Sequence, residues 1–252
     1  MHIPNIKNHW LQFWTFVTTR RVFYTIYFNF RYLPFCQAKH LPIHFFPHAY
    51  ADVEKGAQIV IGDAILNFKY KRVLIGEDLK DFGHQCEKTY LHLAGTISFA
   101  GLTRILRGCT FDVRGTMQIG DNVFISANTK IRVYNRVTIG NVVRIAHESQ
   151  IFDTNFHYVV DVENPEFRPM SHPIKIGSYV WIGNRSTVNA GAVIPDNTIV
   201  ASNSLVNKDL SDIPAYSIVA GTPCKVVKSG VRRVWNMAEE NKYKKQEFAW
   251  CE

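Results

Sequence analysis

The sequence lacks the cysteine patterns of a disulfide scaffold or of a zinc site. Its five cysteines are odd in number, and no two of them form a C-x-x-C pair. They are Cys36, Cys86, Cys109, Cys224 and Cys251. Such a set favours a reducing compartment, where cysteines stay as free thiols. We therefore expect no disulfide framework and no metal site.

Long runs of like charge are also absent, although the chain carries a formal net charge of +8. A basic balance suits nucleic acid, an anionic membrane surface or a phosphorylated small molecule. Because no run of five like charges occurs, the sequence argues against nucleic acid as a partner. The bland alternative is a soluble basic protein whose charge is spread over its surface.

The chain has no apolar run of membrane-spanning length. Apolar stretches cover residues 10–17 and 22–30, and Arg20 and Arg21 separate them. Neither stretch approaches the ~20 apolar residues of a transmembrane helix. No small-residue cleavage site of a signal peptide follows them. These features predict a cytoplasmic protein.

Residues 8–31 have the periodicity of an amphipathic helix. Two apolar stripes recur at i, i+3, i+4 and i+7: Trp10, Phe13, Trp14 and Val17, then Phe23, Ile26, Tyr27 and Phe30. One hypothesis places this helix in a membrane interface, at the inner face of the membrane, with arginines beside the aromatic rings. The other, the commoner case, is a helix packed against the end of the domain. Residues 32–50 contain three prolines, and we expect them to be extended or looped.

From about residue 59 the chain changes to a period of six. The clearest anchors form an unbroken run: Ile176, Ile182, Val188, Ile194, Val200 and Val206. Small or β-branched residues stand four positions after the first five anchors: Val180, Ser186, Ala192, Thr198 and Ser204. A step of six is too long for one helical face, but it suits a short strand followed by a tight turn.

Upstream, three triplets of anchors keep the same step: Phe99, Ile105 and Phe111; Ile119, Ile125 and Ile131; Ile139, Ile145 and Ile151. The triplets start twenty residues apart, so three hexads and two extra residues make one coil, with the extra pair at a corner. The pattern predicts an all-β fold, a parallel β-helix of hexapeptide repeats, in which each coil buries its anchors against the next. A β-sandwich would instead space its strands by about 8–12 residues with drifting phase.

This periodicity divides the chain into three parts. We expect an N-terminal helical and extended appendage over residues 1–50, the β-helix over 51–228 and a short C-terminal helical tail over 229–252. The ladder breaks over residues 152–175, a polar loop that holds Asp153, Asn155, His157, Arg168 and His172. A neutral imidazole near a carboxylate suits general-base catalysis at about pH 7. The alternative for a histidine in a polar loop is simple solvation.

Several motifs in the second half of the chain resemble a known family. They are IKIGSYVWIGNRSTVNAGAVI at residues 174–194, NKDL at 207–210 and VAGTPCKVVK at 219–228. Together they resemble hexapeptide-repeat acetyltransferases of the maltose/galactoside O-acetyltransferase-like group, and the DTNFH run at 153–157 resembles members that decorate surface polysaccharides. The resemblance covers roughly residues 95–230. It implies a left-handed β-helix, acetyl-CoA as acyl donor, and a homotrimer with active sites between neighbouring subunits.

The resemblance also implies roles for single residues. His157 matches the catalytic histidine, which deprotonates an acceptor hydroxyl, and Asp153 would orient it. Relatives often carry a second acid where this chain has Asn155. Ser126 stands where relatives present a backbone N–H to the thioester oxygen, as an oxyanion hole. Trp181 matches a tryptophan beside the acceptor and the thiol, the alternative being an outward-facing aromatic residue.

The positions implied for the donor lie in the last coils. Asn184 and Ser202 match residues that bond the pantetheine arm, and Gly183 would allow its close approach. Four residues match positions that face the nucleotide phosphates: Asn207, Lys208, Lys225 and Lys228. Relatives often have arginine at the last two, so lysine would contact phosphate as a point charge here. For each lysine alone, the alternative is a solvated surface charge.

The sequence therefore predicts an acetyl-CoA-dependent O-acetyltransferase acting on a sugar, in a surface polysaccharide or its lipid-linked precursor. Tyr158, Arg168 and His172 are expected to shape the acceptor pocket. The same fold supports amino-sugar N-acetyltransferases, serine acetyltransferases and non-catalytic subunits. A metal enzyme of the γ-carbonic-anhydrase type would need three histidines from adjacent coils. The candidates His84, His92, His147 and His157 do not show that spacing.

Overall fold

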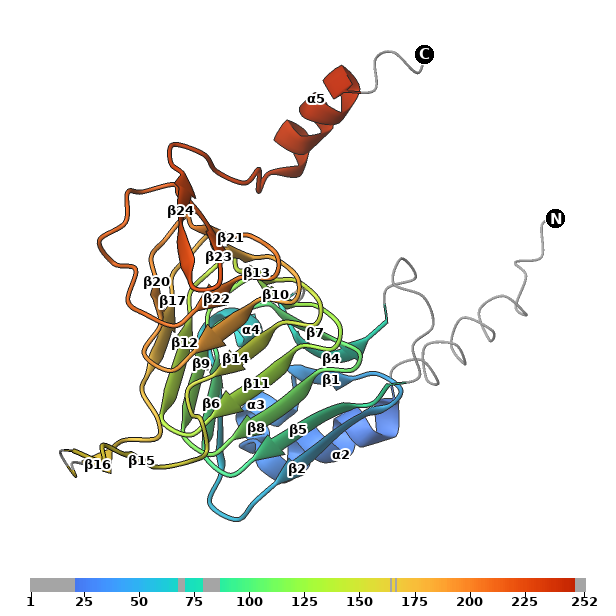
Figure 1. Cartoon of the computed structure of the whole chain (residues 1–252). Coiled ribbons are helices and arrows are strands. Elements are labelled where there is room, and N and C mark those ends of the chain that lie inside the picture. The colour runs from blue at the N-terminus through green and yellow to red at the C-terminus, as the bar shows by residue number, and fades with distance from the viewer. Residues whose placement is uncertain (1–20, 68–70, 79–86, 164, 166, 248–252) are drawn as a thin grey trace.

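The computed structural model describes residues 21–67, 71–78, 87–163, 165 and 167–247, and it shows a left-handed parallel β-helix (Figure 1). Three sheets form the three sides of a triangular prism, which we call faces A, B and C. The chain visits them in that order in every coil, so the corners are A–B, B–C and C–A. The predicted fold class is confirmed, including the N-terminal helical segment and the short C-terminal helix.

Face A holds nine strands in the order β1 (Ile43–Phe45), β4 (Val73–Glu77), β7 (Thr103–Leu106), β10 (Val123–Ile125), β13 (Arg144–Ile145), β18 (Trp181–Ile182), β21 (Ile199–Val200), β23 (Ile218–Gly221) and β24 (Cys224–Lys228). Face B holds seven: β2 (Ala49–Val53), β5 (Thr89–Leu93), β8 (Thr110–Val113), β11 (Lys130–Val133), β14 (Gln150–Phe152), β19 (Thr187–Asn189) and β22 (Leu205–Val206). Face C holds six: β3 (Gln58–Ile61), β6 (Thr96–Phe99), β9 (Thr116–Ile119), β12 (Arg136–Ile139), β17 (Ile174–Ile176) and β20 (Val193–Ile194). β1 and β2 are already rungs, so the coil begins before residue 51.

The anchors stack in register, as the sequence predicts. Ile131 pairs with Phe111 one coil earlier and with Ile151 one coil later, twenty residues away in each direction. Beyond the polar loop the coil shortens to eighteen residues, as in the pair of Val188 with Val206. These five anchors are completely buried. Each coil therefore covers the core of its neighbour.

The two extra residues of each long coil lie at the B–C corner. Between β8 and β9 they are Arg114 and Gly115, whose amides both donate to the Val133 carbonyl, at 2.8 and 3.0 Å. A Cβ on Gly115 would lie 2.3 Å from the carbonyl oxygen of Asn135 in the next coil. Glycine is needed there because the backbones of successive coils approach so closely.

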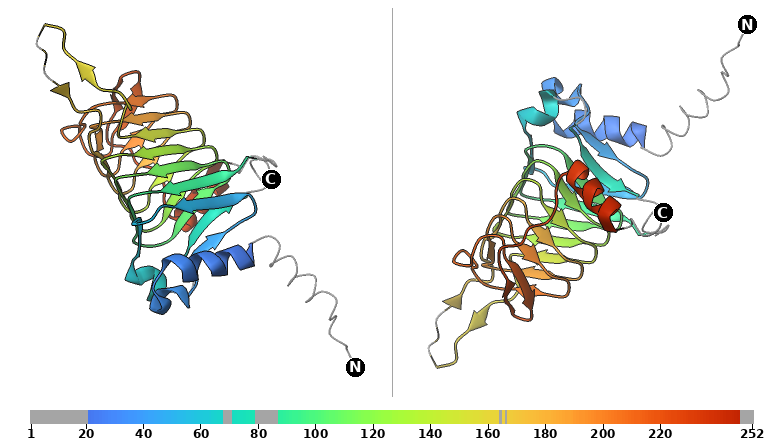
Figure 2. Two further views of the ribbon diagram at one scale, coloured as in Figure 1. Left: turned by 90° about the horizontal axis from the view of Figure 1, so that it is seen from below. Right: turned by 90° about the horizontal axis from the view of Figure 1, so that it is seen from above.

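Helix α2 (Val22–Tyr32) covers the first rung of face A, and the short α3 (Phe35–Ala38) follows it (Figure 2). β1 is the last strand at this end, so its outer backbone groups need partners. Asn29 supplies two of them: its amide nitrogen donates to the Ile43 carbonyl at 2.7 Å, and its Oδ1 accepts the Ile43 amide at 3.2 Å. The Thr25 hydroxyl accepts the amide of Phe45 at 3.0 Å.

Helix α2 packs against the end of the domain, as the commoner alternative predicts. The stripe of Phe23, Ile26, Tyr27 and Phe30 faces solvent, whereas Thr25, Phe28 and Asn29 are buried. The helix packs through the side that carries Thr25 and Asn29, because the open strand edge needs polar partners. The first stripe, over residues 10–17, lies outside the described residues. The segment 32–50 is not wholly extended or looped, because α3 begins directly after Pro34.

The remaining elements lie outside the three faces. The short helix α4 (Asp63–Asn67) sits at the C–A corner, and β15 (Val159–Val160) pairs with β16 (Phe167–Arg168) in an antiparallel hairpin. Helix α5 (Met237–Glu247) projects from the body and buries none of its residues (Figure 1). Among the described helices, none is both long and apolar enough to cross a bilayer.

We expect Asn29→Ala to lower the free energy of unfolding by about 1–3 kcal/mol, because the buried backbone groups of Ile43 lose their partners. Chemical denaturation measures this change. Tyr27→Ala is the matched control on the exposed side of the same helix, and its effect should stay within about 0.5 kcal/mol. Equal losses in the two variants would contradict the bridging role of Asn29.

Candidate functional site

The polar loop leaves the prism at the B–C corner, between β14 and β17. Its base is closed by a bridge between Thr154 and Ser171 and by the Asn155 amide, which donates to the Met170 carbonyl at 3.1 Å. Beyond this base the hairpin of β15 and β16 projects away from the body (Figure 2). The loop is thus a defined excursion from a regular coil, as predicted.

His157 stands at the start of this excursion, and local hydrogen bonds determine its backbone. Phe156 has a positive φ of 64°, and its amide donates to the Thr154 hydroxyl at 3.0 Å. The His157 amide donates to Oδ1 of Asn155 at 3.1 Å, as in an Asx turn. The Phe156 ring meets the ring of Tyr134 edge-on, with centroids 5.4 Å apart. The His157 side chain is exposed just beyond the corner.

Asp153 is completely buried, and its carboxylate is occupied by backbone amides. One oxygen accepts the amide of Tyr134 and the other that of Asn135, both at 2.7 Å. In earlier coils the two equivalent amides at this corner both donate to one backbone carbonyl of the next rung. Where the loop leaves the coil, the Asp153 carboxylate takes the place of that carbonyl. Burial raises the pKa of Asp153, and the backbone hydrogen bonds oppose that rise. Among the described residues, no hydrogen bond joins Asp153 to the His157 ring.

A cavity of about 430 Å³ opens on face A and reaches the A–B corner. Twelve residues line it, among them Ser126, His147 and Trp181. The structure therefore brings Ser126 and Trp181 together, as the predicted roles require. Trp181 is also an outward-facing residue of face A, with 38% of its surface exposed. Trp181 is thus an outward-facing aromatic residue, and its place beside an acceptor and a thiol stays a prediction.

The Ser126 amide donates to the Ile145 carbonyl at 2.9 Å and is part of the parallel ladder. No acceptor for the amide of Ala127, one residue later, occurs among the described residues. The oxyanion role of Ser126 stays a prediction, and the structure adds the neighbouring Ala127 amide as a second candidate donor at the same corner.

The positions predicted for the donor divide between two places. Asn184 and Ser202 meet at the A–B corner, where the Ser202 hydroxyl donates to Oδ1 of Asn184. A Cβ on Gly183 would lie 2.5 Å from the Ser202 amide nitrogen, so the next coil already requires this glycine. The four phosphate candidates are all exposed: Asn207 and Lys208 follow β22 at the B–C corner, and Lys225 and Lys228 lie on β24.

The predicted site residues thus lie in two separate groups on the chain. His157 and Asn155 lie at the B–C corner, whereas Trp181 and Asn184 lie on face A and at the A–B corner. The whole of face B separates the two corners. The predicted acceptor residues Arg168 and His172 line a second cavity of about 280 Å³ with Asn155.

Comparison with known proteins identifies the family, although no family model matches the chain. Over 149 residues the chain is 30% identical to the putative lipopolysaccharide biosynthesis O-acetyl transferase WbbJ of Escherichia coli K12, a match covering 55% of this chain and 74% of that protein. The chain belongs to the hexapeptide-repeat acetyltransferases. It is also 35% identical over 118 residues to galactoside O-acetyltransferase of the same organism, where the match spans only 56% of the relative and 47% of this chain.

The fold of this hexapeptide-repeat acetyltransferase also has a counterpart among solved structures. The crystal structure of the polySia-specific acetyltransferase NeuO is similar with a TM-score of 0.50, over 81% of this chain and 99% of that one. The two sequences are 21% identical. At that identity the similarity concerns the fold alone.

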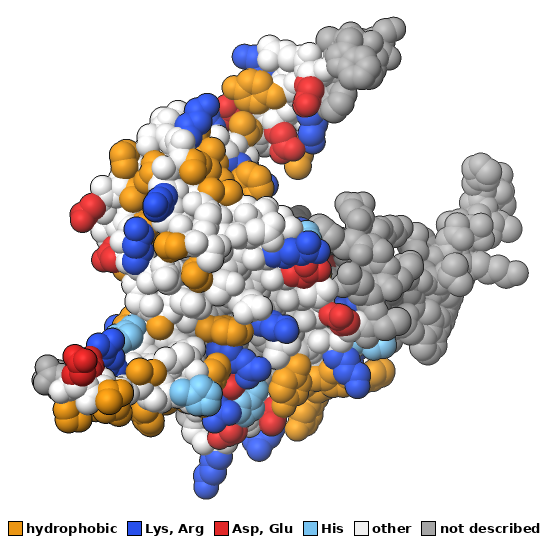
Figure 3. Space-filling model, in the orientation of Figure 1, with side chains coloured by type: hydrophobic (Ala, Val, Ile, Leu, Met, Phe, Trp, Pro, Cys, Tyr) orange, Lys and Arg blue, Asp and Glu red, His pale blue; other side chains and the backbone are white. Residues whose placement is uncertain are grey.

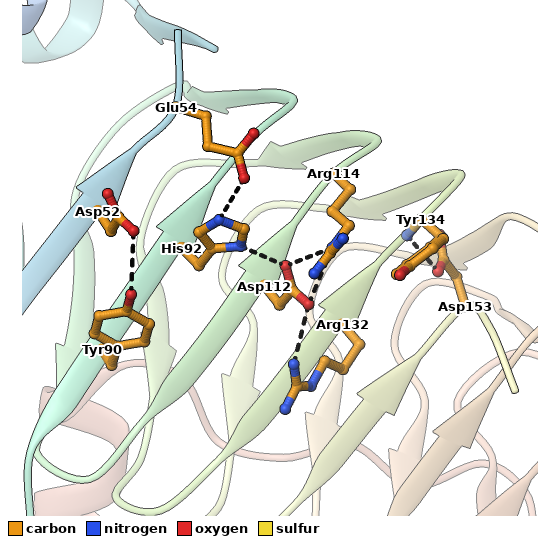
Figure 4. A network of polar contacts seen from close by, with 9 residues as sticks. All are labelled: Asp52, Glu54, Tyr90, His92, Asp112, Arg114, Arg132, Tyr134 and Asp153. Atoms are coloured by element: carbon orange, nitrogen blue, oxygen red, sulfur yellow. Dashed lines mark hydrogen bonds and ion pairs between the residues drawn. The ribbon is translucent and has the colours of Figure 1, made fainter. Parts of the chain in front are cut away.

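A charged network on the outside of face B was not predicted (Figure 4). His92 lies between two acids, with Nδ1 at 2.8 Å from Asp112 and Nε2 at 2.9 Å from Glu54. Arg114 and Arg132 both turn toward the Asp112 carboxylate, at 3.1 and 3.0 Å. Residues 92, 112 and 132 share one column, which the period of twenty would have revealed.

The network reaches the base of the histidine loop. The Arg114 guanidinium lies 5.3 Å from the centroid of the Tyr134 ring, which in turn packs against Phe156. Burial alone would raise the pKa of Asp112, but hydrogen bonds from His92 and the two arginines outweigh it, so that pKa is lowered. The hydrogen bond to Asp112 raises the pKa of His92, and the bond to Glu54 adds to the rise.

The described histidines among the four metal-ligand candidates lie on different parts of the prism. His92 lies on face B, His147 at the A–B corner and His157 at the B–C corner, while His84 lies outside the described residues. Within the described ranges, no group of three His, Cys, Asp or Glu side chains is arranged to hold a metal ion.

The raised pKa of His92 predicts a pH-dependent contribution to stability. Because the folded pKa exceeds the ordinary value of 6.5, protonated His92 stabilises the fold fully below about pH 6.5, and this stabilisation is lost as pH rises through the folded pKa. We expect the difference in melting temperature between wild type and His92→Gln to shrink between about pH 6 and pH 9. Thermal unfolding followed by circular dichroism measures it.

The matched control is His172→Gln, which removes an exposed imidazole from the other side of the loop base. Its melting temperature should differ from that of the wild type by the same amount throughout the range. A pH-independent difference for His92→Gln would show that the ion pairs with Asp112 and Glu54 do not stabilise the fold.

Proposed function

We propose that the protein transfers an acetyl group from acetyl-CoA to a sugar hydroxyl, in a surface polysaccharide or its lipid-linked precursor. The observation that carries the proposal is His157, exposed at the base of the loop that leaves a hexapeptide-repeat acetyltransferase coil between β14 and β17. Two relatives support a sugar acceptor, since they are named galactoside O-acetyltransferase and putative lipopolysaccharide biosynthesis O-acetyl transferase.

His157 acts as the general base in this mechanism. Its neutral imidazole takes the proton of the acceptor hydroxyl as the oxygen attacks the thioester carbonyl. The backbone amide of Ala127 is placed to donate to the oxygen that becomes negative in the tetrahedral intermediate. When the C–S bond breaks, the imidazolium returns its proton to the thiolate of CoA. No bond forms between the acetyl group and the protein.

Asp153 acts on His157 through the backbone. By accepting the amides of Tyr134 and Asn135, its carboxylate ends the regular corner and determines where the loop leaves. Asn155 then shapes the turn that carries His157. The orienting role of Asp153 is in this view a structural one, and the imidazole is positioned by Asn155 and by the packing of Phe156.

The complete site requires a homotrimer. In one protomer the histidine corner and the Trp181 cavity are separated by face B, so a neighbour must supply the missing half. The loop hairpin also exposes an apolar surface, visible at the projecting end of the molecule (Figure 3). It comprises Tyr158, Val159, Val160, Val162 and Phe167, each more than half exposed. Surfaces of this kind are typical of protein interfaces.

The donor lies along the last coils in this arrangement. Asn184 and Ser202 border the A–B corner, and the exposed amide edge there suits the amide groups of a pantetheine arm. Lys225 and Lys228 stand on β24 beyond it, with Asn207 and Lys208 available from the B–C corner of a neighbour. These lysines would contact the nucleotide phosphates as point charges.

We expect His157→Ala to reduce acetyl transfer by about 10²–10⁴-fold, because the attacking hydroxyl loses its base. Release of CoA from acetyl-CoA, measured with a panel of neutral, acidic and amino sugars, follows the reaction. Transfer to an amino group alone would favour the alternative of an N-acetyltransferase. The variant should keep the mass of a trimer, and full activity in it would refute the mechanism.

Co-assembly of two inactive variants tests whether the site is shared. His157→Ala damages one half of the site and Trp181→Ala the other. Mixed trimers contain interfaces with both halves intact, so partial activity should return. Homotrimers of either variant are the control, and a failure to regain activity would place the whole site within one protomer.

We also propose that residues 8–31 attach the protein peripherally to the inner face of the membrane. In the described part of this segment, Phe23 is 81% and Tyr27 57% exposed, and Arg31 lies in the last turn of the same helix. Aromatic and cationic side chains favour the interface of an anionic bilayer. Deleting residues 1–20 and changing Phe23, Tyr27 and Phe30 to serine should release the protein from phosphatidylglycerol vesicles in a sedimentation assay. Unchanged sedimentation would refute the proposal.

A further inference from the structure

One outward-facing column of face A alternates arginine with aromatic residues. Arg104 pairs in register with Phe124, Phe124 with Arg144, and Arg144 with Trp181. Neighbouring strands lie about 4.8 Å apart, so the two arginines stand roughly 9–10 Å apart along the prism axis. All four residues line the face A cavity. We call this set the arginine–aromatic column.

The segment before α5 adds a third guanidinium to the column. Arg233 lies between two tryptophan rings, with its Cζ atom 5.1 Å from the Trp181 centroid and 4.8 Å from that of Trp235. Trp235 also packs against Tyr179, with centroids 6.2 Å apart. Stacking on both sides holds the guanidinium in a preformed position at the cavity wall. The C-terminal segment is therefore part of this cavity.

The positive charge in the cavity is only partly balanced: the Glu240 carboxylate acts on Arg233 through its charge, without a direct ion pair. Arg104 forms an ion pair with Glu77 at 2.7 Å. Arg144 instead donates to Asn122 and to the Val143 carbonyl, which are neutral groups. Among the described residues, neither Arg144 nor Arg233 has a carboxylate within ion-pair distance.

Burial and neighbouring positive charges both act on the Arg144 guanidinium. Burial lowers the pKa of its guanidinium, and the charges of Arg233 and Arg104 lower it further. Guanidinium groups nevertheless stay protonated, so this cavity keeps like charges close together in a partly dehydrated place. An anionic ligand would relieve both the repulsion and the lack of counter-charge.

We propose that the arginine–aromatic column binds the carboxylates of an acidic glycan that lies along face A, an inference that rests on the proposed function. Guanidinium groups bind carboxylates through two parallel hydrogen bonds. The aromatic rungs between them offer flat apolar surfaces to the faces of sugar rings. A chain of sugars repeats along its length as the column does, and Trp181 places one end of it beside the acetyl-transfer site.

The column's position distinguishes this role from donor binding. Its two register arginines lie on β7 and β13, toward the N-terminal coils, whereas the lysines proposed for the nucleotide phosphates lie near the C-terminal end. The acceptor would then be selected by its negative charge, through residues that lie apart from the two corners proposed to carry out acetyl transfer.

Direct binding tests the site without relying on turnover. Isothermal titration calorimetry would compare trigalacturonic acid and a sialic acid trimer with their carboxyl-reduced, neutral counterparts, in the absence of acetyl-CoA. We expect at least one acidic probe to bind about ten-fold more tightly than its neutral form, and Arg144→Gln and Arg233→Gln each to remove roughly that preference. Arg136→Gln, an exposed arginine on face C, is the matched control and should change nothing.

Steady-state kinetics then separate the sources of negative charge. In the two cavity variants the KM for the acidic acceptor should rise about ten-fold, while the KM for acetyl-CoA stays unchanged. A rise in the KM for acetyl-CoA alone would make this a phosphate site and overturn the proposal. Equal binding of acidic and neutral probes, or loss of the trimer in Arg233→Gln, would also overturn it.

The two proposals fail in different ways. If no acceptor is acetylated but the charge preference persists and depends on Arg144 and Arg233, the acetyltransferase function falls and the glycan site stands. If transfer proceeds with no preference between acidic and neutral sugars, in binding or in KM, the glycan site falls and the acetyltransferase function stands.

Discussion

Every feature of this molecule depends on the register between successive parallel coils. Each residue pairs with the residue one coil away, so a position in the coil becomes a column along the prism. The inward columns of anchors are apolar, because each coil buries its core only against the next. Buried serine and threonine side chains at the corners, such as Ser149 and Ser186, donate to backbone carbonyls. Outward columns are free of that demand, and here they carry the Glu54–His92–Asp112 network on face B and the arginine–aromatic column on face A.

Register also limits where the chain can leave the prism. A departing loop removes the carbonyl that the previous coil needs, and two amides at the B–C corner would be left buried without an acceptor. Asp153 supplies two carboxylate oxygens to those amides. The buried acid therefore allows the excursion that carries His157. The contacts of Asp153 are with the backbone of the loop base, and the role in orienting His157 belongs to the proposed mechanism.

The sequence predicts the coil well because inward columns follow one simple rule. The anchors, the period of twenty and the interruption after Ile151 are all properties of residue spacing, and Ile131 stands in the predicted stack. The sequence does not show which side of a helix packs when backbone groups choose the partner. The open edge of β1 selects Thr25 and Asn29 over the aromatic stripe. That competition is not visible in a pattern of side-chain types.

The period of twenty residues also defines outward columns of side chains, besides the inward anchors of the core. Residues 104, 124 and 144 are one column by arithmetic alone, as are 92, 112 and 132. Only the structure shows that both columns face outward, and that Arg104 has an acidic partner whereas Arg144 donates to neutral groups. A prism also keeps its corners apart, so a site that needs residues from two corners needs a second protomer. In the proposed trimer a second protomer supplies the other corner, and the proposed acceptor lies along face A. A long ligand with repeated charge suits a solenoid because both are repetitive in one dimension.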